Sequence, residues 1–395
     1  MSSNQFAISD LRSLEDTHTS GVYPKRSPVI VRGEGARIWD SDGREYIDCV
    51  AGHGVANLGH CHPAVVQAVT EQANRLITCP EIFYNDQRAQ LLARLCELSP
   101  SGLARAFLCN SGAEAVEAAM KFARLATGRT QIVSTMRSFH GRTYGALSLT
   151  GQGKYRKQFE PLVPNIEHMP YNNLDTLSNS VSERTAAVIL EIVQGEGGVR
   201  PASNEYLLGA QELCRQHGAL LIIDEVQTGL GRTGRLFACE HAGLEPDLLC
   251  LAKSLAGGLP MAATLFGERV GELPTGAHAS TFGGNPLVCA AALATLDVLV
   301  SEALPQRAEQ VGGELMARLQ QTRLPVVREI RGLGLMIGLE LKRKVTPILK
   351  ALQERGVLAL PAGATVLRLL PPLVIEATEL EIVADNIQEV LTEPG

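Results

Sequence analysis

Between residues 60 and 290 the chain alternates short apolar, β-rich runs with segments long enough for helices. The runs are ARAFLCN (104–110), TQIVSTM (130–136), TAAVILEIV (185–193), ALLIIDEV (219–226) and DLLCLA (247–252). Strands that are apolar on both faces and separated by helices are typical of a mainly parallel sheet covered on both sides. This pattern predicts an α/β fold whose large domain is built on a doubly wound sheet.

The segments that flank this alternation indicate a second, smaller unit. Residues 36–50 are typical of two short strands joined at Asp42-Gly43, a dipeptide that favours tight hairpins. The C-terminal part predicts an α+β domain, with a long helix over 291–320, strands within 327–342 and 366–376, and a helix near 345–355. We expect three parts: an N-terminal segment packed with the small domain (1–45), the large domain (46–290) and the small domain (291–395).

The composition excludes several classes of partner. The chain has 395 residues, 45% hydrophobic and 20% charged, and its formal charge of −6 argues against a nucleic-acid surface, which needs a basic stripe. No apolar run approaches the ~20 residues of a membrane span, and the N-terminus lacks a signal-peptide pattern. The nine cysteines include no CxxC pair and suit reduced thiols. We expect a soluble, cytoplasmic protein.

The run LLCLAKSLAGG (248–258) places one lysine, Lys253, at the end of an apolar segment. Burial lowers the pKa of a lysine because the ammonium loses its hydration, and the neutral amine is a nucleophile that forms Schiff bases. Two simpler interpretations remain at this point. The amine could reach solvent on its flexible stem, or the run could be a strand whose last residue is exposed.

The segment after the first run predicts a well-capped helix. Ser111 and Glu114 form a capping-box pattern, and Gly128 marks the helix end. The backbone N–H groups of Ser111, Gly112 and Ala113 would then lie at a helix N-terminus, where a phosphate binds well. An ordinary capped helix would show the same pattern.

Two further strand ends carry groups suited to binding a ring and an acid. In FHGRTYG (139–145), Phe139 and His140 are flat groups able to stack, and Arg142 could bind a carboxylate with both arms of its guanidinium. The run ALLIIDEVQTG ends in Asp224 and Glu225, and a carboxylate there would keep a heteroaromatic nitrogen protonated. A helix cap or a loop turn is an alternative reading of this acidic pair.

Taken together, these strand ends predict one cofactor. Ligands of doubly wound sheets gather at the carboxyl ends of the strands. Pyridoxal 5′-phosphate needs a lysine for its aldehyde, N–H donors for its phosphate and an acid for its ring nitrogen. We therefore expect pyridoxal phosphate as the cofactor.

Two other motifs suggest different ligands but lack the required context. GLGRTG (229–234) matches GxGxxG, yet its first glycine lies five residues beyond Asp224 rather than at a strand-to-helix turn, which argues against NAD. The histidines and cysteine of HGVANLGHCHP (53–63) fit no settled zinc spacing and lie among turn signals. We expect no metal site.

Motifs along nearly the whole chain, from residue 20 to 375, resemble one enzyme family. They are NSGAEAVEAAMKFAR, FHGRTYG, QGEGG, IIDEVQTGLGRTG, LAKSLAGGLP, STFGGNP and LRLLPPL, which resemble the class III (subgroup II) aminotransferases of fold type I. The resemblance implies a large domain with a mainly parallel sheet of seven-stranded type and a smaller α+β domain from the two termini. The likeness is nearest to the acetylornithine branch and to the branch acting on carrier-protein-bound aminoadipate semialdehyde.

The resemblance also implies a reaction. A transaminase of this kind would move the ω-amino group of an N-blocked basic amino acid, N2-acetylornithine or carrier-protein-bound lysine, reversibly to 2-oxoglutarate. The products would be the semialdehyde and glutamate, in arginine or lysine biosynthesis. Alternatives are a 4-aminobutyrate, succinylornithine or ornithine δ-transaminase, and, from another class, a catalytically silent cofactor-binding or carrier-docking protein. An acidic amino-group carrier protein is thus an alternative partner.

Residue roles follow from the same resemblance. Lys253 would bind the cofactor and move the proton, and Asp224 would pair with the ring nitrogen. The cofactor would also contact Ser111, Gly112, Ala113, Phe139, Glu225, Val226, Gln227 and, from the neighbouring subunit, Thr281. The Thr281 role requires a homodimer; a tetramer built from such dimers satisfies it too.

Substrate binding is implied for five side chains. Arg142 would bind a substrate carboxylate with Ser280 beside it, and Arg368 would be a second carboxylate site that Glu196 neutralises when it is not in use. Tyr23 would read the donor. The sequence departs from the family pattern at His53, where related ornithine enzymes have a tyrosine, and at Ala113, where many relatives have threonine.

Overall fold

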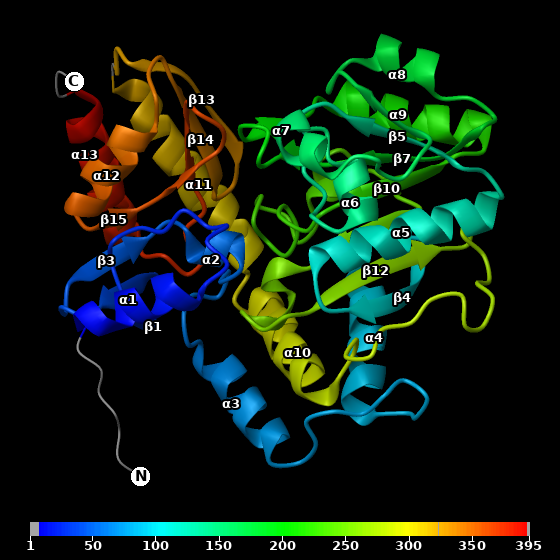
Figure 1. Ribbon diagram of the computed structural model, residues 1–395, viewed down its shortest axis with the longest axis horizontal. Coiled ribbons are helices and arrows are strands. Elements are labelled where there is room, and N and C mark those ends of the chain that lie inside the picture. The colour runs from blue at the N-terminus through cyan, green and yellow to red at the C-terminus, as the bar shows by residue number, and fades with distance from the viewer. Residues whose placement is uncertain (1–7, 323, 393–395) are drawn as a thin grey trace.

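The computed structural model describes residues 8–322 and 324–392, and its centre is a seven-stranded sheet of order β4-β12-β11-β10-β7-β5-β6 (Figure 1). The strands are β4 (Leu103–Cys109), β5 (Gln131–Thr135), β6 (Ile166–Met169), β7 (Thr185–Leu190), β10 (Leu220–Asp224), β11 (Leu248–Leu251) and β12 (Ala262–Gly267). The strand β12 is antiparallel to both of its neighbours, β11 and β4, and the remaining pairs of the sheet are parallel. The expected mainly parallel, seven-stranded α/β fold is confirmed.

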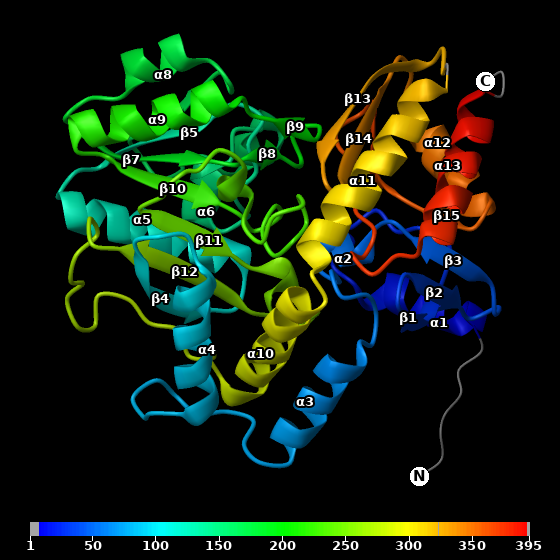
Figure 2. The ribbon, with the colours of Figure 1, turned by 180° about the vertical axis from the view of Figure 1, so that it is seen from behind.

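The apolar strands of this sheet are covered on both faces. Successive residues of β10 alternate between two hydrophobic clusters: Leu220 and Ile222 pack with α5 (Gly112–Thr127), while Leu221 and Ile223 join the cluster on the opposite face. Side chains of a strand point to alternate faces, so a run that is apolar throughout needs a cover on each side. Figures 1 and 2 show α5 on one face, and α9 (Asn204–His217), α4 (Asp86–Leu98) and α10 (Pro286–Ser301) on the other.

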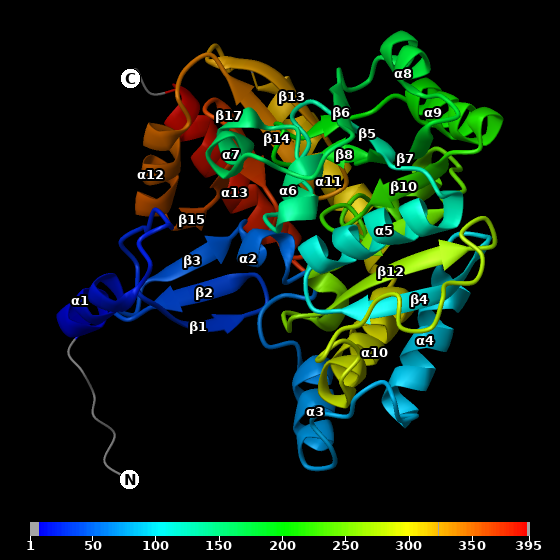
Figure 3. The same cartoon turned by 45° about the vertical axis from the view of Figure 1, so that its right-hand side comes forward.

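The N-terminal strands lie beside the C-terminal part of the chain (Figure 3). The strands β2 (Arg37–Asp40) and β3 (Glu45–Asp48) form the expected hairpin around Asp42-Gly43, and β1 (Ile30–Glu34) pairs with β2. On its other edge β3 pairs in parallel with β15 (Val357–Leu358). A second sheet, β13-β14-β17-β16, is antiparallel throughout. The β3–β15 pair therefore joins the N-terminal strands to the C-terminal part of the chain through backbone hydrogen bonds.

The long helix expected over 291–320 is wrong: the chain forms two helices, α10 and α11 (Leu304–Gln321), bent by 61°. Ala303 has φ 49° between them, and Pro305 lies in the first turn of α11. Proline removes a helical N–H and its ring clashes with the preceding turn, so one continuous helix cannot pass this point. As a result α10 packs on α3 (Pro63–Ala73) and α4, while α11 packs on β13, β14 and α13.

The remaining elements complete the two parts of the molecule. The strands are β8 (Val193–Gln194), β9 (Arg200–Pro201), β13 (Val327–Leu333), β14 (Met336–Leu341), β16 (Leu360–Pro361) and β17 (Val366–Leu369). The α-helices are α1 (Ile8–His18), α2 (Ala51–Gly54), α6 (Tyr144–Leu149), α7 (Gly153–Arg156), α8 (Leu174–Ser180), α12 (Thr346–Glu354) and α13 (Ala377–Thr392). Short 3₁₀ helices are η1 (Lys157–Phe159), η2 (Ala238–His241) and η3 (Lys253–Ala256). Within the described chain no single helix is long and apolar enough to cross a membrane, although the bent pair α10–α11 meets the length and composition requirement jointly.

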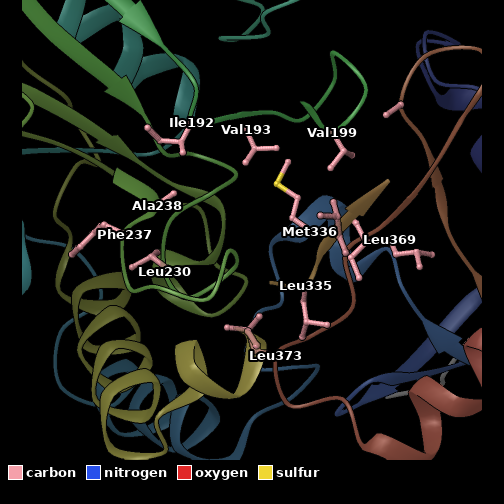
Figure 4. Close-up of a cluster of buried hydrophobic side chains, with 14 of the residues drawn as sticks. Ile192, Val193, Val199, Leu230, Phe237, Ala238, Leu335, Met336, Leu369 and Leu373 are labelled. Atoms are coloured by element: carbon pink, nitrogen blue, oxygen red, sulfur yellow. The ribbon is translucent and has the colours of Figure 1, made fainter. Parts of the chain in front are cut away.

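A buried apolar cluster joins the central sheet side to the C-terminal sheet (Figure 4). Ile192, Val193 and Phe237 come from loops and strands near the central sheet, and Met336 and Leu369 come from β14 and β17. Fully burying such side chains contributes about 1.5–3 kcal/mol each. This contact fixes where β17 lies relative to the ends of the central strands.

Candidate active site

Lys253 lies two residues beyond the last residue of β11, Leu251, and is the first residue of η3. Its backbone has φ 41°, an uncommon conformation for a residue with a side chain, of the kind that concentrates at functional sites. Burial lowers the pKa of its amine, although the negative charges of Asp224, Glu196 and Glu191 act in the opposite direction. The lysine therefore shares one interior region with these acids, and its neutral form is favoured relative to a lysine in water.

Asp224 ends β10, is 5% exposed, and pairs with His140. Its Oδ2 lies 2.7 Å from His140 Nδ1, and its Oδ1 accepts a hydrogen bond from the Val226 N–H at 3.0 Å. Burial alone would lower the pKa of His140, but the hydrogen bond and charge of Asp224 raise it above its ordinary value. His140 Nε2 is buried and has no partner among the described residues. Asp224 is thus a buried carboxylate whose charge is stabilised by the His140 ring.

The helix α5 begins where the sequence predicts. Ser111 is the N-cap, its Oγ accepting from the Glu114 N–H at 3.3 Å, and Gly128 ends the helix in the left-handed conformation. The return bond of the capping box is shifted: Glu114 Oε2 accepts from the Asn110 N–H at 2.9 Å. A Cβ on Gly112 would lie 2.7 Å from Val226 Cγ1, so the helix start touches the residue that follows the Asp224 strand end. First-turn N–H groups have no acceptor within their helix and favour an anion.

The segment 139–142 brings a ring and a cation to the same region. A Cβ on Gly141 would lie 2.8 Å from the Ala113 Cβ, which shows how closely this segment approaches α5. The Phe139 N–H donates to Glu191 Oε1 at 3.0 Å, and burial raises the pKa of Glu191 to about 7. Arg142 is exposed and pairs with no acid in the described part of the chain. Its guanidinium carbon lies 3.8 Å from the centroid of the Tyr155 ring.

Arg368 and Glu196 form the buried pair that the sequence suggests. Arg368 lies on β17 and is 2% exposed, and its Nη2 is 2.6 Å from Glu196 Oε1. Arg368 Nε and Nη1 are buried without partners in the described residues. Burial would raise the pKa of Glu196, but Arg368 lowers it overall, and Lys253 also contributes to that lowering. The pair therefore lies within electrostatic range of the lysine.

Gln227 and Glu225, both expected to contact the cofactor, lie in different surroundings. Gln227 and Arg368 both lie close to the Gly195 loop, since a Cβ on Gly195 would lie 3.5 Å from Gln227 Cγ and 3.6 Å from Arg368 Nη1. The Glu225 carboxylate instead accepts the N–H groups of Ala238 (2.7 Å) and Cys239 (2.8 Å), so it stabilises the start of η2. Both carboxylate oxygens of Glu225 are thus engaged in holding η2, and its contact with the cofactor stays a prediction.

Three expected residues make no contact with the centre in a single chain. Ser280 Oγ accepts from Asn110 Nδ2 at 3.1 Å, beside the start of α5. Thr281 and Tyr23 are exposed. The resemblance assigns Thr281 to the site of a neighbouring subunit, and the roles of all three residues stay predictions.

Sequence reasoning missed the two hydrogen-bonding roles of His140 and Glu191. His140 was expected only as a flat group able to stack, and it pairs with Asp224 instead. Glu191 bonds both Phe139 and the loop before Glu196, with Oε2 accepting from the Gly195 N–H at 3.3 Å. Both residues follow neighbouring strands of the sheet, β5 and β7, and that shared edge is the signal that could have indicated them.

The donor set fits pyridoxal phosphate on its own chemistry. The first-turn amides of α5 suit a dianion, the buried Asp224 suits a protonated ring nitrogen, and the desolvated Lys253 suits an aldehyde. Gly112 leaves no room for a side chain beside Val226, as expected where a ligand approaches backbone closely. No group of three or more His, Cys, Asp or Glu side chains able to hold a metal occurs in the part of the chain described.

Comparison with known families decides the class. The sequence matches the Aminotransferase class-III family over residues 22–391. The chain is a class-III aminotransferase. This aminotransferase is 50% identical over 395 residues to a LysW-aminoadipate semialdehyde transaminase of Deinococcus radiodurans, covering 99% of this chain and 92% of the relative. It is 46% identical over 389 residues to an acetylornithine aminotransferase of Methanopyrus kandleri, covering 98% and 100%.

A solved structure supports the same fold and cofactor class. The ornithine aminotransferase from Toxoplasma gondii superimposes with a TM-score of 0.93 at 36% identity, covering 97% of this chain and 93% of that one. That enzyme carries pyridoxal phosphate at partial occupancy in its active site. The predicted family, fold type I and transaminase class are confirmed for this aminotransferase, and the alternative of a catalytically silent protein is set aside.

Proposed function

We propose that this aminotransferase uses pyridoxal phosphate to move the ω-amino group of an N-blocked basic amino acid to 2-oxoglutarate, reversibly, giving a semialdehyde and glutamate. The donor is N2-acetylornithine or a lysine linked to an amino-group carrier protein. The observation that carries the proposal is the buried Arg368–Glu196 pair, 2.6 Å apart and within electrostatic range of Lys253. An arginine neutralised by a movable acid suits an enzyme that must accept two differently charged substrates in turn.

Pyridoxal phosphate, when bound, supplies an electron sink that stabilises negative charge on the reacting carbon. Lys253 would hold the cofactor, and its amine, whose pKa is lowered by burial, would move the proton. Asp224, fixed by His140 and by the Val226 N–H, holds a proton on the ring nitrogen. Ser111, Gly112 and Ala113 bind the phosphate at the start of α5, and Phe139, Val226 and Gln227 position the ring.

Glu196 selects between the two substrates at Arg368. The amino donor brings an uncharged methylene chain to this position, so Arg368 is best neutralised by Glu196. The acceptor 2-oxoglutarate brings a carboxylate, which must replace Glu196 on the guanidinium. A buried arginine left without a partner would be strongly destabilising, so one acid or the other must occupy it.

Arg142 binds the carboxylate at the blocked end of the donor. It is exposed and unpaired with any acid over the described ranges, so its guanidinium is available for a two-pronged contact. The names of the two curated relatives favour acetylornithine and carrier-linked lysine as donors, in arginine or lysine biosynthesis. A free ornithine or 4-aminobutyrate donor is the second candidate, favoured by the structural likeness to an ornithine aminotransferase.

The active enzyme is a homodimer in which Thr281 completes the phosphate site of the neighbouring subunit. Support comes from an exposed apolar surface: Phe83 and Phe282 are 63% and 64% exposed, and Ile82 and Tyr84 are also exposed. Arg88 joins the two segments, donating to Phe83 O at 3.0 Å and to Gly284 O at 2.9 Å. Large exposed apolar groups gathered in one place mark a protein interface. We also place the enzyme in the cytoplasm, since all nine cysteines are unpaired thiols.

The test is a half-reaction screen of the purified holoenzyme. Acetylornithine, carrier-linked lysine, ornithine and 4-aminobutyrate are each added without an acceptor, and the loss of the cofactor's visible absorbance is followed. One of the two blocked donors should react with the highest kcat/KM, and a higher value for ornithine or 4-aminobutyrate would overturn the proposed donor class. Mixing Lys253→Ala and Thr281→Ala subunits tests the dimer, because only a shared site restores one intact centre per mixed pair.

A further inference from the structure

Arg142 lies against two aromatic rings and, among residues 8–322 and 324–392, pairs with no acid. Its guanidinium carbon lies 3.8 Å from the Tyr155 centroid and 5.6 Å from the Phe139 centroid. The two rings meet edge-on, with centroids 5.7 Å apart at an interplanar angle of 79°. A cation close to a ring face is attracted by the ring quadrupole, and the contact leaves the N–H edges of the guanidinium free.

The two arginines of the site are thus held in opposite ways. Arg368 is paired with Glu196, which any incoming carboxylate must displace. Arg142 meets a neutral ring, which orients it without competing for its N–H donors. An acid in the position of Tyr155 would occupy those donors and reduce the affinity for a substrate carboxylate. The Tyr155 ring therefore orients the Arg142 guanidinium and leaves its N–H donors available for a substrate carboxylate.

Tyr155 lies on a segment that is itself anchored. Its helix α7 follows Gln152, whose Nε2 donates to Arg137 O at 3.3 Å. Arg156, which follows Tyr155 in the chain, donates to the His168 ring on β6, with Arg156 Nη1 2.8 Å from His168 Nδ1. Burial and the Arg156 charge lower the pKa of His168 to about 4, so the ring stays neutral and accepts this bond. The platform under Arg142 is therefore tied to the central sheet.

We propose that Tyr155 is a positioning residue that orients Arg142 for the donor's carboxylate and so helps to select carboxylate-bearing donors. This inference rests on the proposed role of Arg142. It predicts that the aromatic ring matters and the hydroxyl does not. It also predicts that the effect appears in the KM of donors with a carboxylate and not in the turnover of donors without one.

The experiment compares Tyr155→Leu and Tyr155→Phe holoenzymes on a blocked α-amino acid donor and on a simple primary alkylamine. Losing the ring should raise KM for the carboxylate donor about 2- to 5-fold, the value of a cation–ring contact at an exposed arginine, while kcat and the alkylamine kinetics stay at the wild-type values. Tyr155→Phe keeps the ring and should stay close to the wild type. Phe159→Leu is the matched control, because Phe159 is an exposed ring on η1.

Equal losses on both donors, no change in Tyr155→Leu, or a loss in Tyr155→Phe as large as in Tyr155→Leu would each overturn the inference. Cofactor absorbance and Tm confirm that each variant is folded and loaded. Arg142→Ala, measured on the same two donors, distinguishes a failure of the Tyr155 role from a failure of the carboxylate site at Arg142. If Arg142→Ala is selective and Tyr155→Leu is not, only the role of Tyr155 fails. If neither is selective, the proposed carboxylate site at Arg142 fails as well.

Discussion

Replacing Glu196 with alanine should change which amino donor the enzyme prefers. Glutamate must place a carboxylate on Arg368, at the position where the ω-amine donor has only methylene groups. In the free enzyme Glu196 Oε1 lies 2.6 Å from Arg368 Nη2. Binding glutamate therefore requires a charged, largely buried hydrogen bond to break first. Such a bond contributes about 1.5–3 kcal/mol, so its removal should favour glutamate by about 10- to 150-fold. The ω-amine donor gains nothing from the change, because it then faces an unneutralised arginine.

The assay is a pair of single half-reactions followed by stopped-flow absorbance of the bound cofactor. The quantity compared is the ratio of kcat/KM for glutamate to kcat/KM for the blocked ω-amine donor, in wild type and Glu196→Ala. Glu196→Gln keeps a neutral acceptor and should give a smaller shift. Asp385→Ala is the matched control, since it removes an acid from an exposed pair with Arg318 that joins α13 to α11.

An unchanged ratio in Glu196→Ala would refute the reasoning. It would mean that the acid does not compete with substrate at Arg368, and that the observed pair is a fixed structural ion pair. A fall in both half-reactions by the same factor would lead to the same conclusion. Only a shift in favour of glutamate that is larger than in Asp385→Ala agrees with the proposal.

Three further perturbations test other parts of the site. Lys253→Ala should abolish the covalent attachment of the cofactor, seen as loss of the reducible visible band; a band that survives would show that another lysine holds it. Gly112→Ala puts a Cβ within 2.7 Å of Val226 and should weaken cofactor retention in a dissociation assay, whereas Gly313→Ala, in open space within α11, should stabilise the fold by about 0.5–1 kcal/mol. Because Asp224 raises the pKa of His140 above 6.5, the stability from this pair is complete below pH 6.5 and is lost as pH rises through the raised value. The difference in Tm between wild type and His140→Gln should therefore shrink toward alkaline pH, and a constant difference would contradict the charged pair.

The central sheet was predictable because its strands need covers on both faces. The run that became β10 is apolar at every position up to Asp224, and only a parallel strand between two helical layers satisfies such a run. The strand β12 was not predicted. Its sequence, AATLFG, is rich in alanine, and as an antiparallel strand it breaks the alternation of strand and helix. The helix break at Ala303 was missed for another reason: Pro305 at the next helix start was read as part of one long helix.

Within the site, positions were easier to predict than partners. The capped start of α5, the acid at the end of β10 and the lysine after β11 each follow from a local pattern. The pairing of His140 with Asp224 is a contact between residues 84 apart, and no local pattern specifies it. Glu225 shows the converse, since it adjoins Asp224 in sequence yet its carboxylate bonds the amides of η2. Adjacent residues at a strand end point to opposite sides, so one local motif serves two unrelated purposes.

The selection of substrate depends on how the two parts of the molecule are joined. Lys253 and Asp224 belong to the central sheet, whereas Arg368 reaches the site from β17 of the C-terminal sheet. The junction contains a fully buried arginine, Arg232, whose Nη2 donates to Asn57 Oδ1 at 2.7 Å and whose Nη1 donates to Leu335 O at 3.1 Å and to Pro371 O. Pro371 is three residues from Arg368. Arg232 lies in the loop after the central strand β10, and its guanidinium bonds the chain beside β14 and β17. These bonds fix the two sheets relative to each other more strictly than apolar packing, because the buried donors have few alternative acceptors. This junction therefore holds β17, and with it Arg368, in a defined position relative to the strand ends that carry Asp224 and Lys253.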